Sequence, residues 1–325
     1  MNPFEKVELG GTGVAVTRLG MGLAPIGGLY APVGDETAAA AIDAAWNAGV
    51  RFFDTAPFYG AGLSELRAGA ALRGRDGFTL STKVGRRLVP GVAAEPGVWA
   101  EPTGRVPVFD FSAAGVHAAY RDSLERLGRI DVLHLHDPDD HFTEAMGHAL
   151  PALAGLRKDG AIRAVSAGMN QSAMLTDLVR TGLLDCVLLA GRYTLLDQSA
   201  LADLLPECER RGVSVIVGGV YNSGVLADPV RAATFDYRPA APTVVARAQA
   251  MARLCERHGV PLRAAAVQFP LGHPAVVSVL VGMRSPEEAA DAAAMAAVPI
   301  PGALWRDLAD AWLLDRATPV PAYPR

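Results

Sequence analysis

The sequence predicts a closed (β/α)8 (TIM) barrel preceded by an N-terminal β-hairpin. Short Val-, Ile- and Leu-rich runs alternate with Ala-rich stretches of helical spacing, and Gly or Pro stands at most of the junctions. This alternation is typical of a βα repeat. Eight strands and eight helices are expected in 325 residues, which suits a closed barrel better than an open sheet. We therefore expect a single α/β domain, residues 1–325.

The expected elements follow from local patterns. Before the first barrel strand, residues 7–9 and 14–16 flank a Gly-Gly-Thr-Gly turn and predict a hairpin that closes the bottom of the barrel. Short apolar runs predict strands at about 18–24, 51–54, 78–83, 130–136, 162–167, 185–190, 213–217 and 276–281. Ala-rich stretches with capping residues predict helices at 35–48, 64–73, 112–127, 142–158, 171–181, 197–211, 242–258 and 285–297.

A Rossmann domain is disfavoured, and two long connections stand out. No first βα turn carries the GxGxxG pattern followed by an acidic residue about twenty positions later, which argues against a Rossmann domain. Residues 85–111 and 219–241 are rich in Pro, Gly and aromatic side chains, and both leave the exit side of their strands. Long loops at that end of a barrel usually shape a substrate pocket.

Composition restricts the partners. The net charge of −4 provides no basic surface for nucleic acid, and no run of like charges suggests a membrane surface. No segment resembles an export signal or a transmembrane span. Three widely spaced cysteines, Cys186, Cys208 and Cys255, fit buried thiols better than a zinc site or a disulfide framework. We expect a cytoplasmic protein without a metal that acts on a small molecule; its oligomeric state is open.

Three predicted strands end in ionisable residues. The apolar runs 50–53, 78–82 and 130–135 are followed by Asp54, Lys83 and His136. If these are consecutive parallel strands, their carboxyl ends lie side by side at about 5 Å spacings and the three side chains converge. Tyr59 follows Asp54 by five residues and can fold back over the same place. The pattern predicts a pocket in which four ionisable groups meet.

The residues that surround this pocket resemble the aldo-keto reductase superfamily from about residue 5 to 298. The resemblance is strongest in residues 49–60 (GVRFFDTAPFYG), 81–83 (STK) and 136–139 (HDPD). It implies a (β/α)8 fold, a nicotinamide cofactor and Asp54, Tyr59, Lys83 and His136 as the catalytic tetrad.

The chemistry fits these implied roles. A phenol with an ordinary pKa near 10 is a poor base, so the charge of Lys83 is expected to stabilise the phenolate of Tyr59. Asp54 would hold the ammonium group, and His136 would orient the substrate oxygen. His134, two residues earlier on the same strand, is interpreted as a hydrogen-bonded core residue one layer deeper.

The cofactor residues depart from the family pattern. Where relatives carry a Ser-Asn pair after the fifth strand, this chain offers Ser166 and Asn170, of which Asn170 ranks first. After the seventh strand we expect a Gly-rich loop to bind pyrophosphate through its backbone amides, with Tyr221 as a candidate to stack on the nicotinamide. The candidates in this loop are Gly218, Tyr221, Asn222, Ser223, Gly224 and Leu226.

The adenosine end favours NAD. Alignment of residues 285–287 with relatives that use NADP places Gly282 where they carry a lysine and Glu288 where they carry an arginine. A carboxylate near the ribose repels a 2′-phosphate but can accept a hydrogen bond from a free 2′-hydroxyl. Arg284 is a rival cation that leaves NADP open.

Three loop segments point to one branch of the superfamily. Residues 135–139, 191–198 and 222–226 look most like D-threo-aldose 1-dehydrogenases (L-fucose and D-arabinose dehydrogenases), L-galactose dehydrogenase-like enzymes and pyridoxal 4-dehydrogenase. The resemblance implies oxidation of a sugar hemiacetal to a lactone with NAD. The alternatives are an NADPH-dependent aldehyde or carbonyl reductase, a pyridoxal 4-dehydrogenase, and a nicotinamide-sensing regulatory subunit without catalytic activity.

Overall fold

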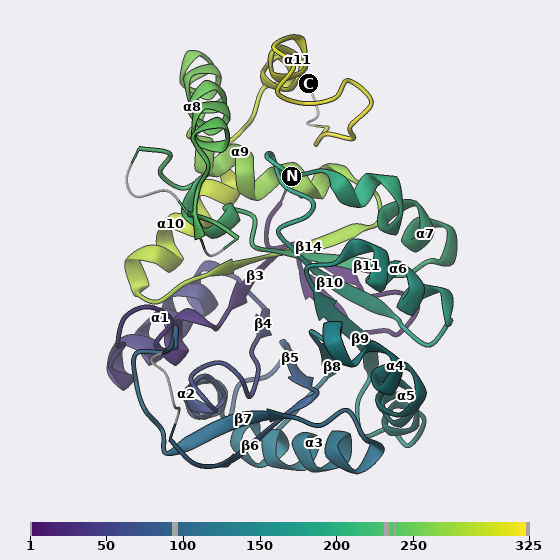
Figure 1. Ribbon diagram of the computed structural model, residues 1–325. Coiled ribbons are helices and arrows are strands. Elements are labelled where there is room, and N and C mark those ends of the chain that lie inside the picture. Colours follow the sequence, from purple (N-terminus) through teal and green to yellow (C-terminus); the bar gives the residue numbers. More distant parts are fainter. Residues whose placement is uncertain (1, 93–96, 231–233, 237, 323–325) are drawn as a thin grey trace.

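A closed barrel of eight parallel strands forms the centre of the molecule. The structure is a computed structural model that describes residues 2–92, 97–230, 234–236 and 238–322. Strands that follow one another in the chain are neighbours around the barrel, and helices surround it (Figure 1). The predicted (β/α)8 barrel is confirmed. Its strands are β3 (Leu19–Gly22), β4 (Phe52–Asp54), β5 (Thr79–Val84), β8 (Val132–His136), β9 (Ala164–Met169), β10 (Cys186–Ala190), β11 (Ser214–Gly218) and β14 (Val276–Gly282).

The helices match the expected ranges with local differences. The expected helix at 142–158 is α4 (Phe142–Glu144), a π-helical turn over 145–149 and α5 (Leu150–Lys158). The expected helix at 197–211 begins as a 3₁₀ turn and bends at Asp203 before α7 (Leu204–Arg211). The remaining predicted helices are α1 (Asp35–Ala48), α2 (Leu63–Leu72), α3 (Ala113–Leu127), α6 (Ser172–Arg180), α8 (Pro242–Arg257) and α10 (Pro286–Ala297).

Two helices were not predicted, α9 (Leu262–Gln268) and α11 (Gly302–Asp310). Helix α9 contacts β14 and α10, whereas α8 contacts α9 and α11 and lies with α11 outside the ring of barrel helices (Figure 1). Six of the seven residues of α9 are buried. A short helix that is buried on nearly all sides lacks the apolar stripe by which a surface helix is recognised.

The N-terminal hairpin closes the barrel at the amino ends of the strands. Strands β1 (Lys6–Glu8) and β2 (Ala15–Thr17) pair in antiparallel fashion. Leu9, Val14 and Val16 are fully buried in a cluster that also contains Phe52 and Val132 from the barrel strands. The expected position of the hairpin is confirmed, and the opposite end of the barrel is left for the active site.

The strands are staggered. Asp54 lies opposite Ser81, Lys83 lies opposite His134, and His136 is two residues further along its strand. Three strand ends at one level were expected, but closing a sheet into a barrel requires tilt and stagger. The functional side chains therefore occupy successive layers.

The first long connection folds over the open end of the barrel. It contains the hairpin β6 (Arg86–Pro90) and β7 (Arg105–Phe109). Two backbone hydrogen bonds join this connection to the loop after β3: the Tyr30 amide donates to the Val98 carbonyl (2.7 Å), and the Ala100 amide donates to the Gly28 carbonyl (2.9 Å). These bonds place Trp99 at the mouth of the barrel. The second long connection contains β12 (Thr234–Phe235) and β13 (Arg238–Pro239).

Candidate active site

A cavity of about 320 Å³ opens at the carboxyl ends of the strands, and Tyr59, Lys83 and His136 line it. Asp54 lies beneath the cavity, because its strand ends one layer lower. The four residues that the sequence singled out are therefore brought together, with three in the cavity wall and one below. No cluster of three or more metal-binding side chains occurs among the residues that the structure describes.

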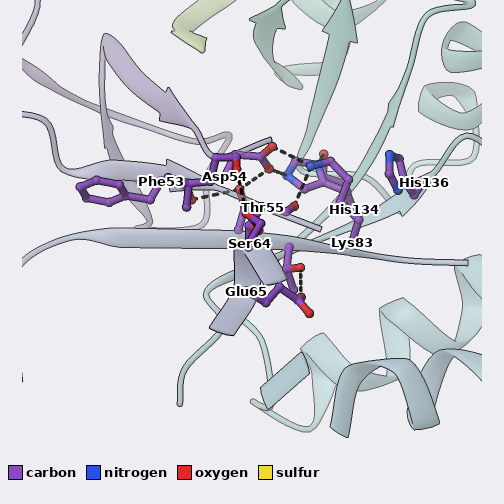
Figure 2. A network of polar contacts seen from close by, with 12 residues as sticks. Phe53, Asp54, Thr55, Ser64, Glu65, Lys83, His134 and His136 are labelled. Carbon is purple, nitrogen blue, oxygen red and sulfur yellow. Dashed lines mark hydrogen bonds and ion pairs between the residues drawn. The ribbon is translucent and has the colours of Figure 1, made fainter. Parts of the chain in front are cut away.

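A buried ion pair forms the base of the site (Figure 2). Lys83 Nζ lies 2.6 Å from Asp54 Oδ2 and donates a second hydrogen bond to the Thr55 carbonyl at 2.7 Å. Ser81 donates to Asp54 Oδ1 at 2.6 Å. Burial opposes the charge on Asp54, but Lys83 and His134 outweigh it and lower the pKa of the carboxyl to about 2. Burial also opposes the charge on Lys83, but Asp54 and Tyr59 raise the pKa of this amine.

His134 lies inside the barrel next to this pair. It is fully buried, its Nδ1 is 2.7 Å from Ser166 Oγ, and its Nε2 is 3.4 Å from Asp54 Oδ1. The interpretation of His134 as a deeper, hydrogen-bonded side chain agrees with this placement. Ser166 is equally buried and bonded to His134. This placement argues against its assignment as a cofactor ligand, because its hydroxyl is turned into the barrel core.

Tyr59 extends over Lys83. The ammonium nitrogen of Lys83 lies 4.6 Å from the centre of the Tyr59 ring. The charge of Lys83 is expected to stabilise the phenolate, but burial raises the pKa of Tyr59 to about 12, while Lys83 acts in the opposite direction. In this pocket the loss of water around the buried phenol outweighs the nearby cation.

His136 faces Tyr59 across the cavity. The two ring centres are 6.1 Å apart, with the planes nearly perpendicular. Burial and the positive charges of Arg86 and Lys83 hold the pKa of His136 well below its ordinary value. The imidazole is therefore neutral at physiological pH and suited to donate or accept a hydrogen bond without carrying charge.

Aromatic side chains wall the cavity, and sequence reasoning did not assign them. Trp99 and Phe58 both line the cavity, and their ring centres are 5.3 Å apart. The Trp99 ring also lies 5.8 Å from that of Tyr59. The aromatic content of the long connection 85–111 was the available signal, but it could not place one ring against Tyr59.

A second buried network supports the strand that carries Lys83. Glu65 on α2 is fully buried; its two carboxylate oxygens accept hydrogen bonds from Thr82 and from Arg126, each at 2.6 Å. Figure 2 shows Glu65 on the far side of this strand from Asp54. Glu65 therefore ties α2 and α3 to β5 immediately beside the catalytic lysine.

The cofactor candidates are distributed around the same opening. Asn170, the first-ranked candidate for the nicotinamide amide, lines the cavity. Gly218 ends β11, and Asn222 is buried with its Nδ2 bonded to the Gly191 carbonyl and its Oδ1 without a hydrogen-bond partner among the described residues. An unpaired buried acceptor at this end of the barrel fits a site that a polar ligand completes.

The loop after β11 differs from the expectation. The amides of Asn222, Gly224 and Leu226 donate to carbonyls within residues 219–221. These three amides are therefore occupied and are not available to a pyrophosphate. Tyr221 is half-buried against the core, and burial raises its pKa to about 12. Ser223 adopts a left-handed conformation with φ of 58°.

The adenosine candidates follow β14. Gly282 ends the strand, and Glu288 lies in the first turn of α10. Glu288 accepts a hydrogen bond from the Arg284 amide at 2.9 Å and forms an ion pair with its guanidinium at 3.2 Å. The two charges therefore neutralise each other.

Comparisons with known proteins agree with this geometry. The aldo/keto reductase family model matches residues 18–312. The chain is 42% identical to a D-threo-aldose 1-dehydrogenase from a Pseudomonas species, covering 93% of this chain and 96% of the relative. It is 39% identical to a pyridoxal 4-dehydrogenase from Microbacterium luteolum, covering 96% and 98%. Among solved structures, glycerol dehydrogenase from Gluconobacter oxydans is 25% identical and superposes with a TM-score of 0.77 over 99% of this chain and 98% of that one.

The family match covers nearly the whole barrel, and the relatives are similar over almost their full length. The described part of the chain contains no helix long and apolar enough to cross a membrane. The chain belongs to the aldo/keto reductase family and is an NAD(P)-dependent oxidoreductase.

Proposed function

We propose that this protein oxidises the cyclic hemiacetal of an aldose, of the L-fucose, D-arabinose or L-galactose type, to a lactone with NAD. The observation that carries the proposal is the meeting of Tyr59 and His136 in one cavity above the Lys83–Asp54 pair. The 42% identity to a D-threo-aldose 1-dehydrogenase supports the substrate class. We further propose that the chain acts as one domain in the cytoplasm, which its three free, buried cysteines fit.

The proposed reaction removes a proton and a hydride from the anomeric centre. Tyr59 accepts the proton of the anomeric hydroxyl, and neutral His136 orients the same oxygen by a hydrogen bond. A bound nicotinamide supplies the acceptor for the hydride from the anomeric carbon. The O–H and C–H bonds break while the carbonyl of the lactone forms, so the two electrons leave with the hydride.

Lys83 and Asp54 prepare Tyr59 for this step. A phenolate forms more readily beside an ammonium group, and Lys83 is the group that lowers the pKa of Tyr59 against the effect of burial. Asp54 keeps that ammonium in place through the 2.6 Å contact. Trp99 and Phe58 exclude water from the reacting atoms.

The cofactor residues favour NAD within this proposal. Asn170 and Asn222 would hold the nicotinamide end, and the segment after β14 would hold the ribose. Arg284 is the cation that could attract a 2′-phosphate, but its charge is neutralised by Glu288. NADP remains the alternative cofactor, as in a carbonyl reductase.

A second candidate substrate is pyridoxal. The 39% identity to a pyridoxal 4-dehydrogenase favours it, because the same proton and hydride transfer would oxidise its cyclic hemiacetal. The aromatic wall of Phe58 and Trp99 would accept a pyridine ring as readily as the apolar face of a sugar.

A substrate panel tests the proposal. Purified protein is assayed for reduced-cofactor absorbance with L-fucose, D-arabinose, L-galactose and pyridoxal, each with NAD and with NADP. Reduction of simple aldehydes is assayed in the same way with NADPH. We expect the highest kcat/KM with one of the sugars and NAD. Oxidation of pyridoxal alone, or reduction of aldehydes with NADPH without any sugar oxidation, would replace the proposal by the corresponding alternative.

Tyr59→Phe removes only the hydroxyl that accepts the proton. We expect turnover to fall by about 10²–10⁴-fold, because general acid–base catalysis by a positioned group contributes that much. Cofactor affinity, measured by fluorescence titration, should stay near that of the parent. Tyr120→Phe is the matched control, since the Tyr120 hydroxyl bonds to the Ala161 carbonyl on the outside of the barrel. Near-normal turnover of Tyr59→Phe would reject the assignment.

Lys83→Met tests the link between the lysine and the phenol. Oxidation needs deprotonated Tyr59, so kcat/KM should rise with pH. Burial already raises the pKa of Tyr59 to about 12 and Lys83 opposes this, so its removal should move the rise to still higher pH. The measurement is kcat/KM against pH, with Lys158→Met on the surface helix α5 as the control. An unchanged pH profile with substantial activity would show that Lys83 does not tune the pKa of Tyr59.

Glu288→Arg should shift the cofactor preference toward NADP. The change replaces a repelling carboxylate by a cation and also frees Arg284 from its ion pair. The effect should appear mainly in the KM values for NADP and NAD. Glu256→Arg on α8 changes the net charge equally, away from the proposed ribose site, and should leave the ratio unchanged. A parent enzyme that already prefers NADP would contradict the proposed role of Glu288.

A further inference from the structure

The turn after β8 directs a carboxylate into the cavity beside the catalytic histidine. Asp137 adopts φ of 39°, a left-handed conformation that Asp tolerates better than most residues, and its amide donates a hydrogen bond to the Gly168 carbonyl at 3.0 Å. Its side chain is one-third exposed and lines the same cavity as Tyr59 and His136. The proton and hydride chemistry above gives this carboxylate no role.

Arg86 fixes the orientation of this carboxylate. Its Nη2 donates to Asp137 Oδ2 at 3.2 Å, and its guanidinium carbon lies 4.8 Å from the ring centres of both Phe58 and Phe109. Held by two rings and one carboxylate, the guanidinium has little freedom. The other carboxylate oxygen, Asp137 Oδ1, accepts no hydrogen bond from any residue within the described ranges.

The carboxylate lies next to the position of the reacting oxygen. Asp137 Oδ2 is 3.4 Å from His136 Nε2, the ring nitrogen on the side of the carboxylate. In the proposed function His136 and Tyr59 hold the reacting oxygen, and Asp137 lines the same cavity beside His136, within reach of a substituent on the neighbouring carbon of the substrate. A hydroxyl on that carbon can donate to the unoccupied carboxylate oxygen, and such charge-assisted hydrogen bonds are among the stronger ones.

We propose that Asp137 is a specificity residue that accepts a hydrogen bond from the hydroxyl on the carbon adjacent to the reacting carbon, and that Arg86 is its positioning residue. The substrate class is thereby narrowed to compounds with an oxygen substituent at this position, which in an aldose is the 2-hydroxyl. The inference rests on the proposed function for the identity of the substrate as a sugar.

The test compares a substrate with and without this hydroxyl. D-Arabinose and 2-deoxy-D-ribose, which is D-arabinose without its 2-hydroxyl, are oxidised with NAD by the parent and by Asp137→Gly. Glycine removes the carboxylate and accepts the positive φ. We expect the parent to prefer D-arabinose in kcat/KM by about 10- to 100-fold, because a hydrogen bond to a charged group contributes that much. Asp137→Gly should reduce this ratio to near one.

Further variants separate recognition from folding and positioning. Asp137→Asn retains an acceptor and also tolerates the left-handed backbone, so an intermediate ratio is expected. Arg86→Met should lower the ratio while leaving the carboxylate in place, and it should do so mainly through KM for D-arabinose. Asp177→Asn, on the surface helix α6, is the matched control and should keep the parent ratio. An unchanged ratio in folded Asp137→Gly would overturn the inference.

Failure of the sugar proposal gives a different result from failure of this inference. If neither sugar is oxidised, the proposed function fails, and Asp137 is tested in the reductive direction with 2-hydroxypropanal and propanal, which differ only in the hydroxyl on the adjacent carbon. A preference for 2-hydroxypropanal that Asp137→Gly abolishes supports the inference. Equal reduction of both aldehydes by the parent, or reduction of neither, overturns it.

Discussion

The ion pair between Lys83 and Asp54 is the interaction on which the rest of the active site depends. Both side chains are almost entirely buried, and removing one member of such a pair typically costs about 3–5 kcal/mol, because the other charge is left unpaired. The pair is satisfied on every side: Ser81 and His134 contact the carboxylate, and the Thr55 carbonyl accepts from the ammonium group. The barrel therefore holds the ammonium group of Lys83 in a fixed position beneath the ring of Tyr59.

Because the strands are staggered, the polar side chains of the site lie at successive heights along the barrel axis, and this pair occupies one of them. His134 and Ser166 lie beside the pair: His134 is opposite Lys83 in the strand register, and it is also opposite Ser166 and hydrogen-bonded to it inside the barrel. Tyr59 and His136 lie above, where the cavity begins, and Trp99 closes the top. Each layer positions the next, which explains why a side chain as deep as His134 can affect the orientation of Asp54 without meeting a substrate.

The sequence predicted what local pattern encodes. Asp54, Lys83 and His136 were found because each follows a buried apolar run, and a polar residue at such a place marks a strand end. The pattern did not reveal the contact of His134 with Asp54 or the inward turn of Ser166, because both depend on the stagger between strands. Trp99 and Asp137 were not assigned either, since their places depend on a loop anchored elsewhere and on an unusual backbone angle.

Burial changes the pKa values of His136 and Tyr59, the two polar residues at the cavity, in opposite directions. It lowers the pKa of His136, so this residue stays neutral and can orient an oxygen without attracting a proton from it. It raises the pKa of Tyr59 to about 12, which by itself would leave the phenol a proton donor at neutral pH. Reduction of a carbonyl needs that donor, whereas oxidation needs the phenolate. Because Lys83 is the cation beneath the ring and opposes the effect of burial, the same pocket can support both directions, with oxidation gaining as the pH rises.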